Sequence, residues 1–417
     1  MYTMEVLLHL IVCLAISISK VHADDQLVQS PSKDNSDTCG CYLINGPDAG
    51  YFQYHRFWDF RDIPNDGSND FTTAPPTLGE LQAHGGQSAT SAYLDSSSWN
   101  SDWSYLDGVS SSSPNSPFPN IYSKQNVYIS RNTTDGAGGS TFLTLRAARL
   151  DSFMSSSQIT SQQQNLLHAS IRARLRVIPN GLRNSSAPSA SARLLDNLEY
   201  GSNSSHPVDQ GAVVGLFTYE SDTQESDIEL LTQDTTGQIW YSNQPDYDNA
   251  ADKPIPGAST HVTLPNGLVW TEWIEHRLDW FDGVVRWWAN DTLVLNKSIN
   301  APSQPSGLIL NVWGDGGYWS GNMSVGGEVT VGIEWIQVVF NVSGSAAGPS
   351  GRSLDHTMIM PRDDMACNIS CSVDGVKQVG YPEVTFHSGG DRSRPSLWAG
   401  DLSKYALGLF ILVLTVF

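Results

Sequence analysis

The chain has 417 residues, a formal net charge of −20 and a hydrophobic content of 40%, which is ordinary for a globular protein. This negative charge argues against binding to nucleic acid, because the phosphates would be repelled. The length would permit two domains, but large β-sandwiches of this size also form a single domain.

The N-terminus has the features of a secretion signal. An apolar run over Val6–Ile18 is followed by small residues at the usual cleavage positions, Val21-His22-Ala23. We therefore expect residues 1–23 to be removed and the polar segment 24–38 to be disordered. In a secreted chain, eight Asn-x-Ser/Thr sequons become candidate surface glycosylation sites. They are Asn132, Asn184, Asn203, Asn290, Asn296, Asn322, Asn341 and Asn368.

Four cysteines remain once Cys13 has left with the signal. An even number in an oxidising compartment predicts two disulfides. The four lie only at the ends of the folded region: Cys39, Cys41, Cys367 and Cys371. They allow three pairings, and a bridge from the first pair to the second would join the two ends of the domain. Their spacing is poor evidence for zinc, and we predict no metal site from it.

The middle of the chain has the pattern of an all-β protein. From Val127 onwards, apolar and polar residues alternate as they do in half-buried strands. In HASIRARLRV, the apolar residues from Ile171 face one way and the arginines the other. Asp282-Gly283 is a strong hairpin signal, and only Gln158–Leu167 suggests a short helix. We predict one β-sandwich or jelly roll over residues 39–343.

The C-terminus ends in an apolar run over Tyr405–Phe417. As a helix this run would be about 20 Å long at 1.5 Å per residue, which is shorter than the bilayer core of about 30 Å. We expect residues 391–417 to be a glycolipid (GPI) attachment signal after a Ser-, Gly- and Pro-rich tail over residues 344–390. A short tail-anchor helix is the alternative. The candidate attachment residues are Ser388, Gly389 and Gly390.

Three carboxylates alternate in the segment ESDIE, at Glu225, Asp227 and Glu229. Residues two apart on a strand face the same side, so all three acids line one face. Retaining glycosidases use two carboxyl groups about 5–5.5 Å apart. Residues i and i+4 have Cα atoms roughly 13 Å apart, and glutamate side chains that lean inwards could approach the retaining separation. The triplet therefore suits a nucleophile and an acid/base, although a solvated strand face can show the same pattern.

The triplet and its surroundings resemble glycoside hydrolase family 16 over about Val127–Phe340. ESDIELL is similar to the E-x-D-x-E signature of that family, and the segments that follow it keep the order of the family: EHRLDWFDGVVRWWAND, LILNVWGDGGYWSG and VGIEWIQVVF. The resemblance implies a concanavalin A-like jelly roll with a concave substrate cleft. It also implies Glu225 as nucleophile, Asp227 as assisting acid and Glu229 as acid/base. Ser226 departs from the apolar residue that is usual there, and we expect it to loosen the packing on the core side.

Aromatic rings stack on the apolar faces of sugars, and amide side chains bind the polar edges. Our candidates for sugar contacts are Trp313, Asn311, Trp240, Asn243, Gln244 and Trp319. Of the adjacent Trp287 and Trp288, one should lie in the core and one should be exposed. His276 is expected to be structural.

Together these features predict a secreted, monomeric, GPI-anchored cell-surface glycosidase that acts on β-1,3- or β-1,3/1,4-glucan. One alternative is a cell-wall transglycosylase that crosslinks glucan or chitin chains. Others are a carbohydrate-binding wall protein without turnover and a structural surface protein. The chemistry requires no cofactor, and family members often hold a structural calcium whose ligands this sequence does not reveal.

Overall fold

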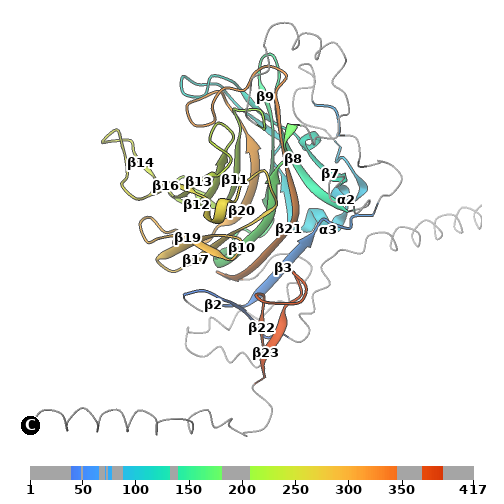
Figure 1. Cartoon of the computed structure of the whole chain (residues 1–417), viewed down its shortest axis with the longest axis vertical. Helices are drawn as coiled ribbons and strands as arrows, with labels where there is room; N and C mark the ends of the chain where they lie inside the picture. Colours follow the sequence, from blue (N-terminus) through green and yellow to red (C-terminus); the bar gives the residue numbers. More distant parts are fainter. Residues whose placement is uncertain are drawn as a thin grey trace, which may run out of the picture.

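The computed structural model describes residues 39–47, 50–64, 71, 74–77, 88–131, 140–180, 207–344 and 369–387. Regular structure in these residues is almost entirely β (Figure 1), which confirms the predicted all-β class. The helices among them are short: α2 (Ala92–Asp95), α3 (Ser97–Asp102) and the 3-10 helices η2 (Lys124–Asn126) and η4 (Pro265–Gly267). None of the described helices is long and apolar enough to cross a membrane.

Two antiparallel sheets pack face to face. The first, called here the cleft sheet, has the order β16 (Ser259–Thr263), β13 (Gln238–Asn243), β12 (Gln224–Leu231), β11 (Val213–Ser221), β20 (Gly307–Trp313), β9 (Met154–Ser161) and β4 (Trp103–Tyr105). The second, the outer sheet, has the order β19 (Thr292–Lys297), β18 (Val284–Ala289), β17 (Ile274–Phe281), β10 (Leu166–Val177) and β21 (Glu328–Val342). On the far side of β21 lie β3 (Tyr54–Asp59) and β8 (Thr141–Arg149), with β7 (Val127–Arg131) beyond β8. The two sheets form the predicted β-sandwich jelly roll.

The sheets are joined through β9. Its second half pairs with β20 and β4 in the cleft sheet, and its first residues pair with β8. Those first residues also pair with β6 (Asn120–Tyr122), which forms a hairpin with β5 (Gly108–Ser110). A second small hairpin, β14 (Tyr247–Asp248) with β15 (Lys253–Pro254), projects from the body after β13 (Figure 1).

The core lies between the two sheets and is filled by one residue in two from each strand. Leu216 and Ile228 of the cleft sheet meet Leu278, Trp287 and Ile336 of the outer sheet, and all five are buried. Each such side chain contributes about 1.5–3 kcal/mol by leaving water. In β10, Ile171, Ala173, Leu175 and Val177 belong to this core, which confirms the alternation that the sequence shows, although Arg172 and Arg176 on the other face are buried as well.

Two other core predictions can be compared with the structure. Trp287 lies in the core, whereas Trp288 faces the opposite way and is half-buried beneath the guanidinium of Arg277, 4.7 Å from the ring. His276 is fully buried, and its ring nitrogens have no hydrogen-bond partner among the residues that the structure describes. Burial lowers the pKa of His276 to about 4, so the ring is neutral. Its position is structural, as expected.

The short helix predicted over Gln158–Leu167 is wrong. Gln158–Ser161 complete β9, and Leu166 begins β10. The Ser- and Gln-rich segment has only a weak local preference, and β20 supplies a strand partner along Ser157–Thr160. Pairing with a distant strand therefore decides its conformation.

A small separate sheet, called here the terminal sheet, brings the two ends of the domain together. Its order is β2 (Gly50–Phe52), β1 (Cys41–Ile44), β22 (Ile369–Ser372) and β23 (Glu383–His387), and in Figure 1 β22 and β23 lie next to β3. A disulfide joins Cys39 to Cys371 across 332 residues of sequence. This is a bridge from the first cysteine pair to the second, one of the pairings that the sequence leaves open, and Cys41 is disulfide-bonded as well.

Several predicted features lie outside the described residues: residues 1–38, residues 345–368 and 388–417 with Cys367, Ser388, Gly389 and Gly390, and the sequons at Asn132, Asn184, Asn203 and Asn368. The remaining sequon asparagines are all exposed or half-buried, which leaves them accessible: Asn290, Asn296, Asn322 and Asn341.

Candidate active site

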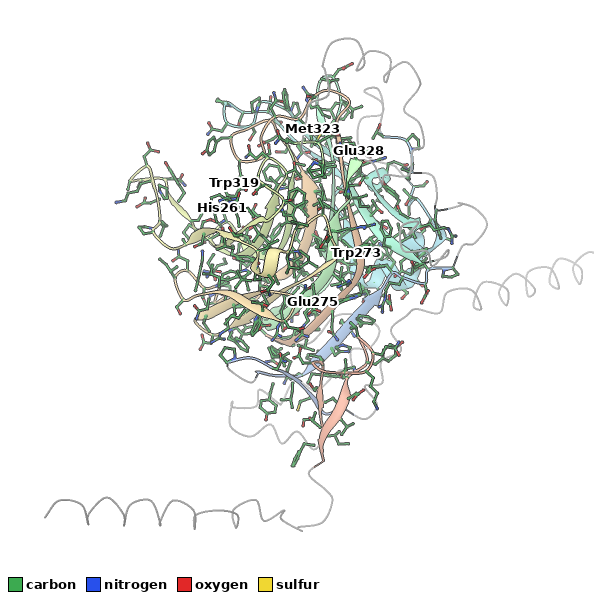
Figure 2. The ribbon with its side chains drawn as sticks, viewed as in Figure 1. His261, Trp273, Glu275, Trp319, Met323 and Glu328 are labelled. Atoms are coloured by element: carbon green, nitrogen blue, oxygen red, sulfur yellow. A yellow bond between two sulfur atoms is a disulfide. The ribbon has the colours of Figure 1, made fainter. Side chains whose placement is uncertain are left out.

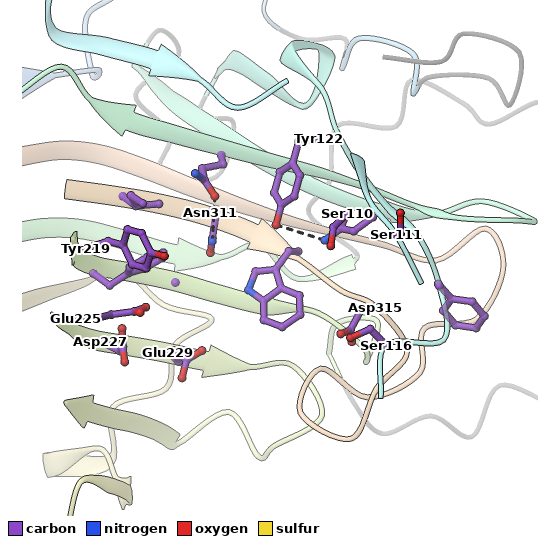
Figure 3. A pocket seen from close by; sticks show the side chains of 17 residues that line it. Ser110, Ser111, Ser116, Tyr122, Tyr219, Glu225, Asp227, Glu229, Asn311 and Asp315 are labelled. Carbon is purple, nitrogen blue, oxygen red and sulfur yellow. Dashed lines mark hydrogen bonds between the residues drawn. The ribbon is translucent and has the colours of Figure 1, made fainter. Parts of the chain in front are cut away.

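The acidic triplet lies on β12, in the middle of the cleft sheet. Glu225, Asp227 and Glu229 all line one cleft of about 500 Å³ (Figure 3). The alternate residues of the same strand, Ile228 and Leu230 among them, are buried against the outer sheet. β12 is hydrogen-bonded to β11 on one side and β13 on the other, so the backbone holds the three acids in a fixed row.

A row of residues crosses the sheet at the level of Glu229. Glu229 is opposite Gly215 on β11, Gly215 is opposite Asn311 on β20, and Asn311 is opposite Gln158 on β9. A Cβ on Gly215 would lie 2.6 Å from Oδ1 of Asn311. The absence of a side chain at Gly215 therefore lets the side chains of Asn311 and Phe217 pack over the strand beside Glu229.

The other two acids have aromatic neighbours on β11. Tyr219 is opposite Glu225, and Phe217 is opposite Asp227. Both rings line the cleft, and so does Trp313 near the end of β20. The cleft thus combines carboxylates with flat apolar surfaces, which is the combination that sugar rings require.

Two side chains from outside β12 hydrogen-bond to the triplet. Nε2 of Gln244 donates to Oδ2 of Asp227 over 3.0 Å, and the backbone N–H of Gln244 donates to the carbonyl of Glu225 over 3.0 Å. Nε1 of Trp319 donates to Oε1 of Glu229 over 3.1 Å. Asp227 and Glu229 therefore have different hydrogen-bond partners.

The environment raises the pKa of all three carboxyl groups. Burial raises the pKa of Glu225 to about 7; the hydrogen bond with Asp227 opposes this, and the charge of Glu229 adds to it. Burial and the charge of Glu225 raise the pKa of Asp227 well above its usual value. Burial and the charge of Asp227 raise the pKa of Glu229 to about 8, against the hydrogen bond from Trp319. Burial therefore favours the protonated form of each acid, and the hydrogen bond between Asp227 and Glu225, which lowers the pKa of Glu225 and raises that of Asp227, makes Asp227 the better donor of the two.

The structure brings together five of the six residues that we predicted to contact sugar. Trp313 and Asn311 line the cleft, and Gln244 and Trp319 contact the acids. Trp240 is opposite Glu229 on the next strand, β13, and so lies on the same face of the sheet.

The sixth placement, Asn243 in the cleft, is wrong. Asn243 is opposite Ser226, on the face of β12 that points away from the acids. Its Oδ1 accepts a hydrogen bond from Oγ of Ser226 over 2.7 Å, and its Nδ2 donates to the carbonyl of Ile299 over 2.9 Å. Both Asn243 and Ser226 are fully buried. The sequence showed that Asn243 follows the acidic strand at hairpin distance, but not which way it faces.

One wall of the cleft was not predicted. Ser110, Ser111 and Tyr122 of the β5–β6 hairpin line it together with Asp315 of the loop after β20 (Figure 3). The backbone N–H of Phe118 donates to the carbonyl of Asp315 over 2.8 Å, which joins the hairpin to the loop. These segments lie far apart in the sequence, and no local pattern reports the contact.

In the part of the chain that the structure describes, no group of three or more His, Cys, Asp or Glu side chains could hold a metal ion. Calcium binding remains a prediction.

No protein-family model matches the chain, and no curated protein matches it either. Solved structures with similarity include a Bacillus licheniformis β-glucanase, 15% identical over 58% of this chain and 94% of that one, with a TM-score of 0.40. A Bacteroides ovatus mixed-linkage glucan GH16 protein is 14% identical over 57% and 95%, with a TM-score of 0.41. A laminarinase from Flavobacterium sp. UMI-01 is 16% identical over 58% and 94%, with a TM-score of 0.39. They are glucan-active proteins of the class that the motifs resemble. At these identities and TM-scores they carry no argument about chemistry, which has to come from the site itself.

Proposed function

We propose that the protein is an extracellular glycosidase that cleaves β-1,3- or β-1,3/1,4-glucan with retention of anomeric configuration. The observation that carries this proposal is the row of Glu225, Asp227 and Glu229, which lie on one strand and face one cleft. The two glutamates have different hydrogen-bond partners: Asp227 for Glu225 and Trp319 for Glu229. A solvated strand face would leave these carboxyl groups in water with ordinary pKa values. Their burial in a cleft favours an active site.

In the proposed mechanism, the carboxylate of Glu225 attacks the anomeric carbon and forms a glycosyl ester, while Glu229 gives its proton to the leaving glycosidic oxygen. Glu229, now ionised, then removes a proton from water, and the resulting attack releases the sugar and restores Glu225. Asp227 donates a hydrogen bond to Glu225 and so keeps its charge available for attack. The raised pKa of Glu229 supplies the acid form that the first step needs.

The lining of the cleft supports a polysaccharide substrate. Trp313, Phe217 and Tyr219 offer rings for stacking, and Asn311 offers an amide whose Oδ1 lies over Gly215. The predicted secretion signal and the predicted GPI signal support a location at the cell surface, where glucan is accessible. Whether water or a sugar hydroxyl completes the second step decides between hydrolysis and chain transfer, and product analysis separates the two.

The test is to incubate the purified protein with β-1,3- and mixed-linkage glucan oligosaccharides, with and without chitin oligosaccharides as acceptors, and to analyse the products. Glu225→Gln and Glu229→Gln should each lower kcat at least 100-fold. Glu220→Gln, the same change at an exposed residue near the end of β11, serves as the matched control. No products from the unaltered protein, or full turnover by both variants, would refute the proposal.

Adding azide to alanine variants of the two glutamates shows which is the nucleophile and which is the acid/base. In Glu225→Ala, azide can replace the nucleophile and attack the anomeric carbon of an activated donor once, which gives a glycosyl azide of inverted configuration. In Glu229→Ala, azide instead attacks the glycosyl ester on Glu225 in place of activated water, and two inversions give a retained product. The opposite pattern would exchange the roles of the two glutamates.

A further inference from the structure

The loop after β20 reaches back to the acidic strand through one side chain. Tyr318 at its tip is 96% exposed, whereas the adjacent Trp319 is half-buried and donates its indole N–H to Oε1 of Glu229 over 3.1 Å. An indole nitrogen can only donate a hydrogen bond. Oε1 of Glu229 must therefore be an acceptor, and in the neutral acid the proton is left for Oε2.

The ring of Trp319 is held from the side by a stack of two further rings. Trp240 meets it edge-on, with ring centroids 4.9 Å apart at 61°. The ring of His261 stacks on Trp240, with ring centroids 4.3 Å apart and an angle of 8° between the ring planes. The stack follows the register of the sheet, since Glu229, Trp240 and His261 are opposite one another on β12, β13 and β16. Figure 2 shows His261 and Trp319 close together on this side of the molecule.

One carboxylate fixes the two rings of the stack. Oδ2 of Asp234 accepts the indole N–H of Trp240 over 2.9 Å and lies 3.1 Å from Nε2 of His261. The next residue back, Gln233, holds the loop itself: its Nε2 donates to the carbonyls of Tyr318 and Trp319 over 3.1 and 2.6 Å. Gln233 and Asp234 lie in the turn just beyond β12, which ends at Leu231. The turn that follows the strand of Glu229 therefore carries two of the groups that hold its hydrogen-bond donor.

We infer that Trp319 is a positioning residue for Glu229, and that an indole clasp made of Gln233, Asp234, Trp240 and His261 holds Trp319 in place. The inference rests on the proposed function, in which Glu229 is the acid/base. By occupying Oε1, Trp319 directs the transferable proton to Oε2 and keeps the carboxyl in one orientation in both steps. Nothing in this arrangement requires Trp240 or Trp319 to stack on sugar, the role that their sequence positions suggested.

The inference predicts the direction of a pH effect. The N–H of Trp319 stabilises the ionised form of Glu229, so Trp319→Phe removes that stabilisation and raises the pKa of the acid. The alkaline limb of kcat/KM reports the loss of the acid's proton. It should therefore move up by about one pH unit, while kcat falls. The other titratable groups around Glu229 are Glu225 and Asp227 on β12, Asp246 after β13, and Asp234 with His261 beyond Trp240.

Kinetics and NMR test the inference separately. Trp319→Phe should shift the alkaline limb upwards and keep the Tm close to that of the unaltered protein. Asp234→Ala should shift it in the same direction by less, and Asp234→Asn, which can still accept one hydrogen bond, should shift it less again. Tyr318→Phe, at the exposed neighbour, is the matched control and should leave the limb in place. An unmoved limb in a folded Trp319→Phe variant would overturn the inference.

The NMR measurement does not depend on turnover. In protein labelled with ¹⁵N at tryptophan, the indole resonance that disappears in Trp319→Phe should shift with pH as Glu229 ionises. It should stop doing so in Glu229→Gln. A Trp319 resonance that is insensitive to pH and to Glu229→Gln would overturn the inference even in an active enzyme. Absence of turnover in the unaltered protein would refute the proposed function, and the indole titration would still decide whether Trp319 positions Glu229.

Discussion

Replacing Asp374 by asparagine tests how the terminal sheet is held against the sandwich. Asp374, just beyond β22, accepts hydrogen bonds from Nη1 and Nη2 of Arg172 on β10 over 2.6 and 3.1 Å. It also accepts the backbone N–H of Asn45 over 2.7 Å and lies 3.7 Å from Arg277. The side chain of Arg172 is only 5% exposed. Asparagine keeps the shape of the side chain and removes the charge that Arg172 faces.

The expected cost follows from the burial of the charge that remains. Removing one partner of a buried ion pair typically costs about 3–5 kcal/mol, because the other charge stays buried without compensation. The lower end of this range applies here because both arginines near Asp374 keep another carboxylate. Glu275 lies 4.0 Å from Arg172, and Asp279 pairs with Arg277 over 2.7 Å. We expect Asp374→Asn to lower the free energy of unfolding by about 3 kcal/mol and the Tm by roughly 6 °C or more.

Thermal and guanidinium unfolding at pH 7 measure this change, and Glu272→Gln, the same kind of change at an exposed residue, is the control.

A pH series gives an independent check. Burial opposes ionisation of Asp374, but the hydrogen bonds from Arg172 outweigh it and lower its pKa. Such a group stabilises the fold above its unfolded pKa of about 3.9 and loses this effect as the pH falls through the folded pKa. The difference between the two proteins should therefore shrink below about pH 4. A variant within about 0.5 kcal/mol of the unaltered protein at pH 7 would refute the reasoning.

Two further predictions concern the cleft. The pH profile of kcat/KM should be a bell with both limbs above the ordinary glutamate pKa of about 4.3, because burial raises the pKa values of Glu225 and Glu229; a limb near pH 4 would contradict their buried placement. Gly316→Ala should cost about 1–3 kcal/mol and raise KM, because Gly316 has φ +73° and its Cβ would lie 2.3 Å from the Phe118 ring in the cleft wall. Gly326→Ala has a similar φ of +82° but open space around it; equal losses in the two variants would show that the contact with Phe118 contributes nothing.

The parts of the fold that the sequence predicts are those encoded by local alternation. The strand around Ile171 and the turn at Asp282-Gly283 need only a few neighbouring residues to be recognised, and both are present. The common face of Glu225 and Glu229 follows from the same rule. The hydrogen bond between Trp319 and Glu229 does not, because it depends on where a loop 90 residues further along the chain returns.

The parts that local patterns miss are contacts between distant segments. The arginines of β10 look like a solvent-exposed face in the sequence, yet Arg172 is buried because the terminal sheet covers it through Asp374. The cleft wall near Phe118 arises in the same way, from a hairpin that docks on a glycine-rich loop. In each case a polar or small residue has a partner that no nearby pattern identifies.

The departure at Ser226 shows how the two faces of one strand depend on each other. A slip of one residue in the pairing of β12 would turn all three acids into the core. Ser226 is fully buried, and its hydroxyl donates to Asn243 on β13, whose amide in turn donates to the carbonyl of Ile299. A buried hydrogen bond of this kind is costly to leave unmade, so it favours the pairing in which Ser226 is opposite Asn243. The serine therefore does not simply loosen the packing: from the face that substrate never reaches, it stabilises the register that puts Glu225 and Glu229 into the cleft.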